Sequence, residues 1–247
     1  MSDTAIKIIN LHKKYEDEIY AVQGIDLLIK KGEFYGLLGP NGAGKSTTIN
    51  AITGLVKPTK GSITVFNKDI VSDFRYTRSK IGIAPQEISN DWFFSVEQLL
   101  YFQAGFYGIE RKNAKERIEY ILHKVGLYDH KDKKMRQLSG GMKRRLQIAR
   151  ALVTDPEILI LDEPTAGVDV ALRHDLWDFL QQLHKGGKTI LLTTHYIDEA
   201  ELLCERVGII NNGKLIAEDT VPNLKSSIDK SKLEDVFLEL TGRTLND

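Results

Sequence analysis

The fold is decided by residues 39–46, which read Gly39-Pro40-Asn41-Gly42-Ala43-Gly44-Lys45-Ser46 and fit the pattern G-x-x-x-x-G-K-[ST]. The three glycines let the backbone approach phosphate oxygens and take conformations that a Cβ would forbid. An apolar strand is expected before the loop, over residues 33–38, and a helix after it, over residues 45–53. The free N–H groups at the start of that helix favour an anion. We therefore expect Lys45 to meet the β- and γ-phosphates of a nucleotide and the Ser46 hydroxyl to hold Mg²⁺.

An acidic pair follows a second apolar run. Residues 158–161 predict a strand covered on both faces, with Asp162 and Glu163 at its carboxyl end, where open α/β sheets bind ligands. Asp162 can support Mg²⁺, and Glu163 can orient or deprotonate an attacking water. Alone, the pair would more simply cap the next element, but with the glycine-rich loop it predicts a P-loop nucleotide hydrolase. The segment Asn67-Lys68-Asp69-Ile70 misses the guanine-selective pattern N-K-x-D at Ile70, so adenine is favoured.

The pattern around these motifs predicts an α/β protein with a helical block near its middle. Short apolar runs at residues 6–11 and 21–29 indicate strands before the loop. Residues 95–151 carry helical periodicity and few strand signals. The pattern of a parallel sheet returns after Pro156, and residues 221–240 predict a helical tail.

Composition narrows the class of protein. The 247 residues include 34 Lys and Arg against 34 Asp and Glu, which argues against a broad electrostatic footprint for nucleic acid. The one cysteine, Cys204, allows no intrachain disulfide, so a reducing cytosol is the default, and its apolar neighbours predict a buried thiol. No apolar run approaches the roughly 20 residues that span a bilayer, and the N-terminus shows no secretory signal. Work at a membrane would therefore need a partner.

The segment that narrows the function is Leu138-Ser139-Gly140-Gly141-Met142. Ser139 and the two glycines predict a second helix N-terminus exposed to an anion, although alone they would be a simple capped turn. Here the sequence resembles the ATP-binding cassette (ABC) ATPase family, over nearly the whole chain. The resemblance implies an α/β fold: a P-loop NTPase core with a RecA-like, mixed and mainly parallel sheet, an N-terminal antiparallel β subdomain and an inserted α-helical signature subdomain.

The resemblance further implies a single ABC ATPase domain over residues 1–247. Its core would occupy residues 1–86 and 155–220, and the helical insert residues 87–154. A short helical tail would occupy residues 221–247.

The resemblance also carries roles to matching positions. Tyr15 would stack on adenine, with Tyr20 as the competing candidate, and Asp169 would signal across a dimer. Gln86 would contact Mg²⁺ and the attacking water, and His195 would contact the γ-phosphate. The implied catalytic residues are Glu163, His195 and Gln86, and the implied metal ligands are Ser46, Gln86 and Asp162. The implied ATP-binding residues are Tyr15, Gly39, Pro40, Asn41, Gly42, Ala43, Gly44, Lys45, Ser46, Thr47, Ser139, Gly140 and Gly141. Met142 replaces the family's usual Gln and Val168 its usual Leu, and neither change suggests a dead site.

In the family, two subunits pair head to tail, and each ATP lies between one phosphate loop and the partner's signature. The resemblance therefore implies an ATP-dependent homodimer, ATP and Mg²⁺ as cofactors, an integral membrane permease as a separate partner, and a peripheral place on the cytoplasmic face of the inner membrane. The aromatic residues within 91–107 are expected to contribute to permease docking, or else to the core of the helical block.

The direction of transport is the last expectation. Residues 233–242 resemble the end of ATPases from ABC-2 type exporters, which favours export over import. One alternative is a soluble ABC-type ATPase acting on nucleic acid or ribosomes, and another is a binding module without hydrolysis. The charge balance and the intact acids speak against these two alternatives, respectively.

Overall fold

The computed structural model describes residues 3–15, 19–87, 91–168, 170–227 and 232–242. The strands are, in chain order, β1 (Thr4–Lys14), β2 (Tyr20–Lys30), β3 (Phe34–Leu38), β4 (Lys60–Val65), β5 (Lys68–Asp69), β6 (Ile81–Ala84), β7 (Ile158–Asp162), β8 (Thr189–Thr194), β9 (Arg206–Asn211) and β10 (Lys214–Thr220). The helices are α1 (Lys45–Ile52), α2 (Phe74–Ser79), α3 (Val96–Phe106), α4 (Arg111–Lys124), α5 (Gly140–Leu152), α6 (Val170–Lys185), α7 (Ile197–Leu203), α8 (Val221–Ser227) and α9 (Leu233–Thr241), with 3₁₀ turns η1 (Tyr128–His130) and η2 (Met135–Gln137).

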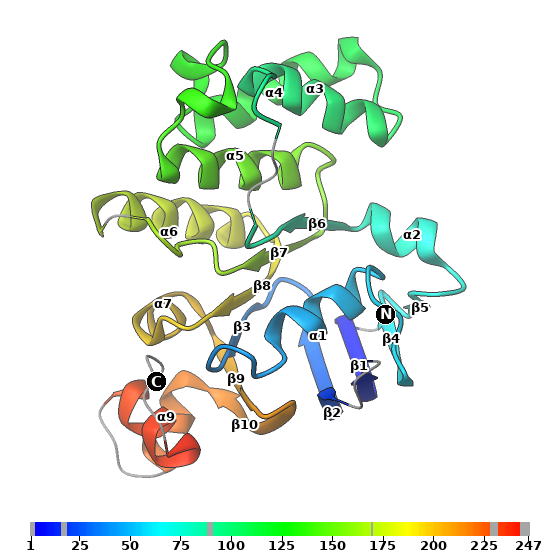
Figure 1. The fold of residues 1–247 in the computed structure, drawn as a ribbon, viewed down its shortest axis with the longest axis vertical. Coiled ribbons are helices and arrows are strands. Elements are labelled where there is room, and N and C mark those ends of the chain that lie inside the picture. Colours follow the sequence, from blue (N-terminus) through cyan, green and yellow to red (C-terminus); the bar gives the residue numbers. More distant parts are fainter. Residues whose placement is uncertain (1–2, 16–18, 88–90, 169, 228–231, 243–247) are drawn as a thin grey trace.

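A sheet of six strands runs through the molecule in the order β10-β9-β3-β8-β7-β6 (Figure 1). Its neighbouring strands are parallel, apart from the antiparallel pair β9–β10. Strands β3, β7 and β8 are buried along their whole length, as expected of apolar runs covered on both faces. Because parallel strands share a direction, the loops after β3, β6, β7 and β8 leave the same edge of the sheet.

A smaller antiparallel sheet, in the order β2-β1-β4-β5, lies beside the first one. Helix α1 lies between the two sheets (Figure 1). Its Ile49 and Ile52 are buried in one core with Ile6 and Ile8 of β1 and Leu37 of β3. The predicted N-terminal antiparallel subdomain is therefore confirmed.

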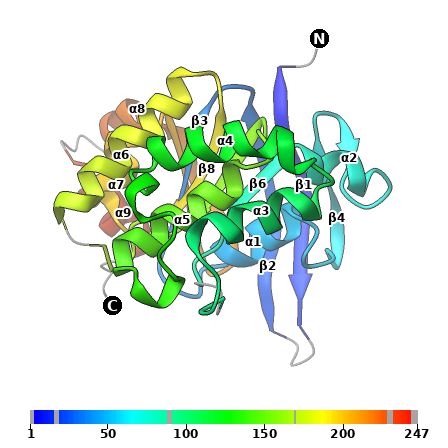
Figure 2. The ribbon, with the colours of Figure 1, turned by 90° about the horizontal axis from the view of Figure 1, so that it is seen from above.

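The other face of the six-stranded sheet is covered by later helices. Side chains of β3 alternate between the two cores: Tyr35 and Leu37 join the core around α1, whereas Phe34 and Leu38 join the core that includes α3 to α9. Helices α3, α4 and α5 group together near the β6 edge (Figures 1 and 2). These helices come between β6 and β7 in the chain, so the predicted helical insertion in an α/β core is confirmed.

Some elements differ from the sequence predictions. Strands β1 and β2 extend past their apolar runs, because backbone pairing continues through polar residues such as Lys13 and Lys14. The tail is two helices, α8 and α9, where one was predicted, and Lys232 before α9 has an extended backbone, with φ −120° and ψ 144°. Strand β5 and helix α2 were not predicted, because both are short and largely polar.

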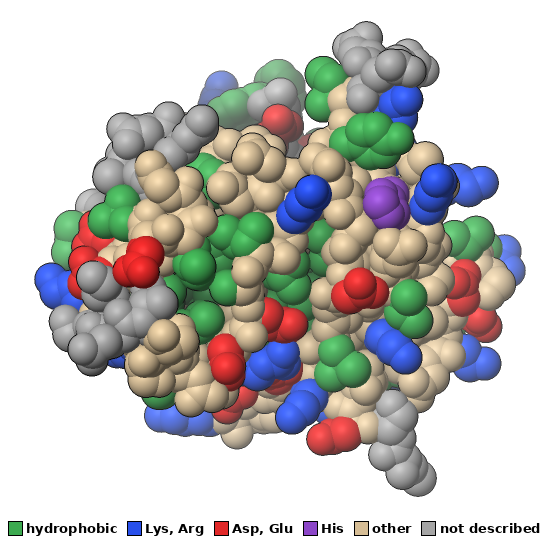
Figure 3. Space-filling model, turned by 90° about the horizontal axis from the view of Figure 1, so that it is seen from below, with side chains coloured by type: hydrophobic (Ala, Val, Ile, Leu, Met, Phe, Trp, Pro, Cys, Tyr) green, Lys and Arg blue, Asp and Glu red, His purple; other side chains and the backbone are tan. Residues whose placement is uncertain are grey.

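The surface carries both signs of charge. The face in Figure 3 has Lys and Arg side chains interspersed with Asp and Glu, and hydrophobic side chains between them. This mixture agrees with the formal net charge of zero. Within the described ranges, no helix combines the length and the apolar character that crossing a bilayer requires.

Candidate functional site

Loops from one edge of the large sheet bring several of the predicted site residues together. The loops after β3, β6, β7 and β8 carry, in that order, Gly39, Gln86, Glu163 and His195. A cavity at this edge is lined by Ala21, Asn41, Gly42, Gly44, Lys45, Ser46, Thr47, Gln86 and Glu163. The predicted phosphate loop therefore shares one cavity with two of the three predicted catalytic residues.

The glycine-rich loop turns tightly into α1. Gly44 precedes the helix in a left-handed conformation, with φ 109°, and a Cβ there would collide with the Ala21 carbonyl. A Cβ at Gly39 would collide with the Ile210 carbonyl. Only glycine suits these two positions. No side chain caps α1, so its first N–H groups remain available to a ligand in the loop.

Lys45 is held inside the loop. Its side chain is 5% exposed, and Nζ donates to the carbonyl oxygens of Gly39 at 2.7 Å and Pro40 at 3.1 Å. Nζ also lies 3.5 Å from Glu163 Oε1. Burial lowers the pKa of the Lys45 ammonium, while the charges of Glu163 and Asp162 raise it. The site thus contains a buried cation balanced by two acids.

The other two predicted catalytic residues, Gln86 and His195, lie beside the carboxylate of Glu163, which is 4% exposed. Its Oε2 accepts a hydrogen bond from Gln86 Nε2 at 2.9 Å. The same oxygen lies 3.1 Å from His195 Nδ1, and the two atoms are not joined by a hydrogen bond. Glu163 has φ 49°, a left-handed backbone that costs a non-glycine residue free energy and that occurs preferentially at functional sites. The structure thus brings Lys45, Gln86 and His195 to one carboxylate.

Asp162, at the end of β7, is 7% exposed and contacts the neighbouring strand β8. Its Oδ1 accepts a hydrogen bond from the hydroxyl of Thr193. The Thr193 carbonyl in turn accepts a hydrogen bond from the Glu163 backbone N–H at 3.0 Å. Thr193 was not predicted as a site residue, because its contact depends on the register that pairs it with Asp162. Its position two residues before His195 was the one available signal.

The donor groups of the cavity fit Mg²⁺. This ion prefers oxygen ligands and is usually held by one or two carboxylates together with substrate phosphates. Ser46 and Gln86 line the cavity, and Asp162 directly precedes Glu163, which also lines it. Across the described part of the chain, no three His, Cys, Asp or Glu side chains gather in a metal-binding cluster. An ion bound here would therefore take further ligands from a nucleotide.

The signature residues start α5, away from this cavity. Ser139 caps α5, and its hydroxyl accepts a hydrogen bond from Met142 N at 3.3 Å, as the sequence predicted for a helix start. Ser139 and Gly140 are exposed, and none of residues 139–141 lines the cavity around Lys45. Within one chain, the structure does not bring the two predicted phosphate-facing helix starts together. Asp169 lies outside the described residues.

Neither candidate for adenine stacking lines the cavity around Lys45. Tyr15 is 44% exposed, with Lys13 Nζ 4.9 Å from its ring centroid, and Tyr20 is 50% exposed, with Lys14 Nζ 5.4 Å from its ring centroid. Tyr20 lines a neighbouring hollow with His12 and other residues. The choice between Tyr15 and Tyr20 stays a prediction.

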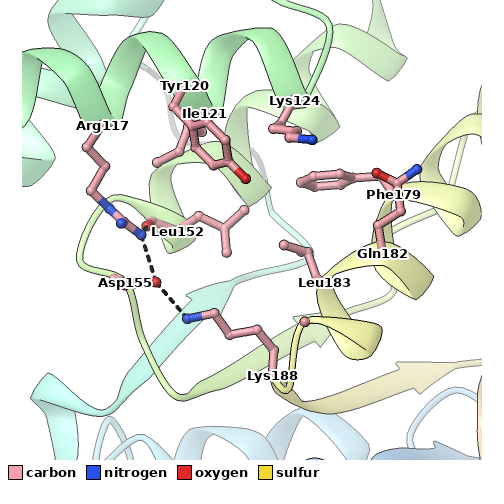
Figure 4. A pocket seen from close by; sticks show the side chains of 11 residues that line it. Arg117, Tyr120, Ile121, Lys124, Leu152, Asp155, Phe179, Gln182, Leu183 and Lys188 are labelled. Carbon is pink, nitrogen blue, oxygen red and sulfur yellow. Dashed lines mark hydrogen bonds and ion pairs between the residues drawn. The ribbon is translucent and has the colours of Figure 1, made fainter.

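A second cavity, of about 370 Å³, lies between α4 and α6 (Figure 4). Charged groups in its wall pair with one another: Asp155 lies 3.0 Å from Arg117 and 2.7 Å from Lys188. Apolar side chains such as Leu152 and Leu183 form much of the remaining wall. No residue of the phosphate loop, and none of the acids around Lys45, lines this cavity. We therefore assign it no part in the reaction.

Comparisons with known proteins identify the family. Residues 22–166 match a family model described as ABC transporter. The chain is 43% identical over 218 residues to Nod factor export ATP-binding protein I of Burkholderia orbicola (strain AU 1054), a match that covers 88% of this chain and 71% of that protein. It is 42% identical over 238 residues to the linearmycin resistance ATP-binding protein LnrL of Bacillus subtilis (strain 168), covering 96% of this chain and 75% of that protein.

A solved structure of an ATP-binding cassette, dimeric and in a post-hydrolysis state with ADP and Pi, is similar in fold. It matches with a TM-score of 0.79 and 30% sequence identity, over 87% of this chain and 98% of that one. The glycine-rich loop, the acids at the end of β7 and the signature segment all lie within 22–166, the range matched by the family model. The chain therefore belongs to the ABC transporter family, as an ATP-binding subunit that hydrolyses ATP.

Proposed function

We propose that this chain is the ATPase subunit of an ABC-2 type exporter. It would bind MgATP at a head-to-tail interface between two copies and drive transport by a separate membrane permease. The observation that carries the proposal is the convergence of Lys45, Gln86 and His195 on Glu163. Phosphoryl transfer to water needs this set of groups: a cation for the γ-phosphate, polar groups that orient water, and a carboxylate that accepts its proton.

The phosphates bind at the loop and the start of α1. Backbone N–H groups of residues 39–47 cradle them, and the Lys45 ammonium contacts the β- and γ-phosphates. Lys45 Nζ lies 3.5 Å from Glu163 Oε1. A γ-phosphate carries more negative charge than one carboxylate, so it takes over this contact and releases Glu163 to the attacking water. Ser46, Gln86 and Asp162 would hold Mg²⁺, which would neutralise phosphate charge.

Glu163 orients the attacking water and accepts its proton. The carboxylate is nearly fully buried, so the water it binds is shielded from bulk solvent. Gln86 fixes one side of this carboxylate, with its Nε2 2.9 Å from Oε2. His195 Nδ1 lies 3.1 Å from the same oxygen, and His195 contacts the γ-phosphate. The pair therefore holds water and phosphate in line for hydrolysis.

A second copy of the chain completes each ATP site. Residues 139–141 start α5 outside the cavity of their own chain, and Ser139 and Gly140 are exposed, so these N–H groups are free to bind an ATP held by the partner. The dimeric cassette to which this chain is similar supports the arrangement. Tyr15 stacks on the adenine. Closure on ATP and reopening after hydrolysis then reset the permease.

The permease docks on an aromatic surface of the helical block. We define this surface as Trp92, Phe93, Phe94, Phe102, Phe106 and Tyr107. All six side chains are exposed, with Phe93 at 76% and Phe106 at 82%. Phe94 and Phe102 also pack edge to face, with ring centroids 4.9 Å apart. Exposed apolar patches of this kind suit a protein partner.

The permease would hold the subunit at the cytoplasmic face of the inner membrane. The printed names of two relatives, for Nod factor export and linearmycin resistance, support export as the direction of transport. We also propose that residues 1–247 form a single cassette, with the helical insert at residues 87–154 and a helical tail at residues 221–247.

Glu163→Gln tests the proposed chemistry. Gln keeps the shape of the side chain but accepts no proton, so kcat should fall by about 10²–10⁴ while ATP binding persists and the ATP-bound dimer accumulates. Size-exclusion chromatography with ATP and a phosphate-release assay report these two effects. The matched control is Glu157→Gln, which removes an exposed carboxylate paired with Lys80 just before β7 and should leave kcat unchanged. Wild-type turnover by Glu163→Gln would rule out Glu163 as the base.

Substitutions in the aromatic surface test the docking. Phe93→Ser combined with Phe106→Ser should abolish co-purification with the permease and leave basal ATPase activity intact. Leu55→Ser, at another exposed apolar side chain (68% exposed), is the matched control and should retain the permease. Retention of the permease by the double variant would refute this docking surface.

A further inference from the structure

Helix α5 makes a set of contacts that none of the proposed roles explains. Arg144 and Gln147 lie three residues apart, on one face of this helix, and are 8% and 5% exposed. Both side chains point to the backbone of the segment that follows β6. Arg144 Nη1 donates to the Gln86 carbonyl at 2.6 Å and to the Pro85 carbonyl at 3.3 Å. Gln147 Nε2 donates to the Glu87 carbonyl at 2.6 Å.

The two side chains also bind each other. Arg144 Nη1 donates to Gln147 Oε1 at 3.0 Å, so the amide is fixed at both ends. Three consecutive carbonyl groups, of residues 85–87, are therefore held from one helix face. Both donor side chains are buried, which strengthens these partly buried bonds, and removing one donor leaves its carbonyl without this hydrogen bond.

The helix that carries this pair is itself fixed against β6. A Cβ at Gly82 of β6 would collide with the Ala151 carbonyl of α5, so the helix backbone rests directly on the strand. Figure 1 shows α5 lying along the β6 edge of the sheet. The segment after β6 is thus held between a strand it continues and a helix that rests on that strand.

We propose that Arg144 and Gln147 are positioning residues, which hold the backbone of residues 85–87 so that the Gln86 side chain meets Glu163. The path is continuous: α5 binds the Gln86 carbonyl, and the Gln86 amide donates to Glu163 Oε2 at 2.9 Å. This inference rests on the role proposed above for Gln86 and Glu163. Helix α5 also connects the signature with Gln86 of the same chain. Ser139 caps the start of this helix, about 7–8 Å along the helix axis from Arg144.

Replacing Arg144 would also change the electrostatics of the site, because its positive charge interacts with Glu163 and Asp162. Gln147→Leu separates the two effects, since this replacement changes no charge. Gln147→Leu removes the donor to Glu87 and the acceptor for Arg144. Gln147→Glu keeps the acceptor but cannot donate to the Glu87 carbonyl when it is ionised. A fall in activity shared by both variants therefore reports the hold on the backbone.

The test is a double-mutant cycle with Gln86, measured as steady-state ATP hydrolysis by the full chain. Gln147→Leu should lower kcat about five- to tenfold and leave the KM for ATP within about twofold. Gln86→Ala should lower kcat at least as much. The double variant should be no slower than Gln86→Ala within about twofold, because the hold on the backbone has no effect once the amide is gone. Arg144→Lys should recover part of the activity that Arg144→Met loses.

The matched control is Gln182→Leu, a change of the same type on α6, which should leave kcat unchanged. If Gln147→Leu fails to fold, as judged by circular dichroism, Gln147→Glu takes its place in the cycle. Losses that multiply in the double variant, or wild-type kcat in Gln147→Leu and Gln147→Glu, would overturn the positioning role while leaving the role of Gln86 intact. Wild-type kcat in Gln86→Ala alone would instead overturn the role proposed for Gln86, and the positioning role with it.

Discussion

Replacing Thr193 by Val tests how the acid at the end of β7 is held. The change removes one hydroxyl from a fully buried position on β8 and keeps the branched shape of the side chain. Asp162 Oδ1 loses the hydrogen bond that this hydroxyl donates, and the Glu163 N–H loses a weaker contact with it at 3.3 Å. Hydrogen bonds to charged groups contribute about 1.5–3 kcal/mol. In a chain of this size each kcal/mol shifts the Tm by roughly 2–4 °C, so Thr193→Val should lower the Tm by about 3–12 °C.

The assay is thermal unfolding without nucleotide, combined with a titration of Mg²⁺ in the ATPase reaction. If Asp162 supports the ion, losing its fixed orientation should raise the Mg²⁺ concentration for half-maximal activity. Thr189→Val is the matched control: its hydroxyl, also on β8, accepts a 2.9 Å hydrogen bond from the neutral Gly32 N–H, so its removal should cost about 0.5–1.5 kcal/mol. Equal Tm shifts in both variants, with no change in the Mg²⁺ titration, would refute the reasoning.

Three further outcomes are expected. Gly39→Ala, whose Cβ would meet the Ile210 carbonyl, should destabilise the fold by more than about 2 kcal/mol in urea unfolding, whereas Gly105→Ala, in an open position of α3, should be neutral or stabilising. Lys45→Met should abolish binding of a fluorescent ATP analogue and keep the wild-type circular dichroism spectrum; retained binding would contradict the role of Lys45. Burial raises the pKa of Glu199, so the folded chain binds more protons than the unfolded chain above the ordinary Glu pKa, and stability should fall as pH rises through the raised value. Glu199→Gln should flatten this fall in Tm, measured from the ordinary Glu pKa upward, and an unchanged slope would exclude Glu199 as its source.

The cavity around Lys45 could be predicted because local patterns and sheet topology determine it. The glycines at 39 and 44 occupy positions where a Cβ would collide with backbone, so the motif itself specifies the loop. Glu163 and His195 each follow a buried strand, and parallel strands end at one edge. Their convergence with Lys45 thus required no knowledge of side-chain packing.

Contacts that depend on register or on helix docking could not be predicted. The Thr193 hydroxyl reaches Asp162 only because β7 and β8 pair with those two residues opposite each other. Arg144 reaches the Gln86 carbonyl only because α5 docks on β6 in one rotation about its axis. Helical periodicity predicts that α5 has a buried face but not which backbone that face binds.

The aromatic surface has a consequence for how the cell must make this protein. A copy produced without a membrane partner would present six exposed aromatic side chains to every other chain in its surroundings. Such a copy is prone to self-association and is a natural client for chaperones and proteases. If the proposed permease covers this surface, the abundance of the ATPase should follow that of the permease, and overproduction of the ATPase alone should yield aggregates that co-expression of the permease relieves.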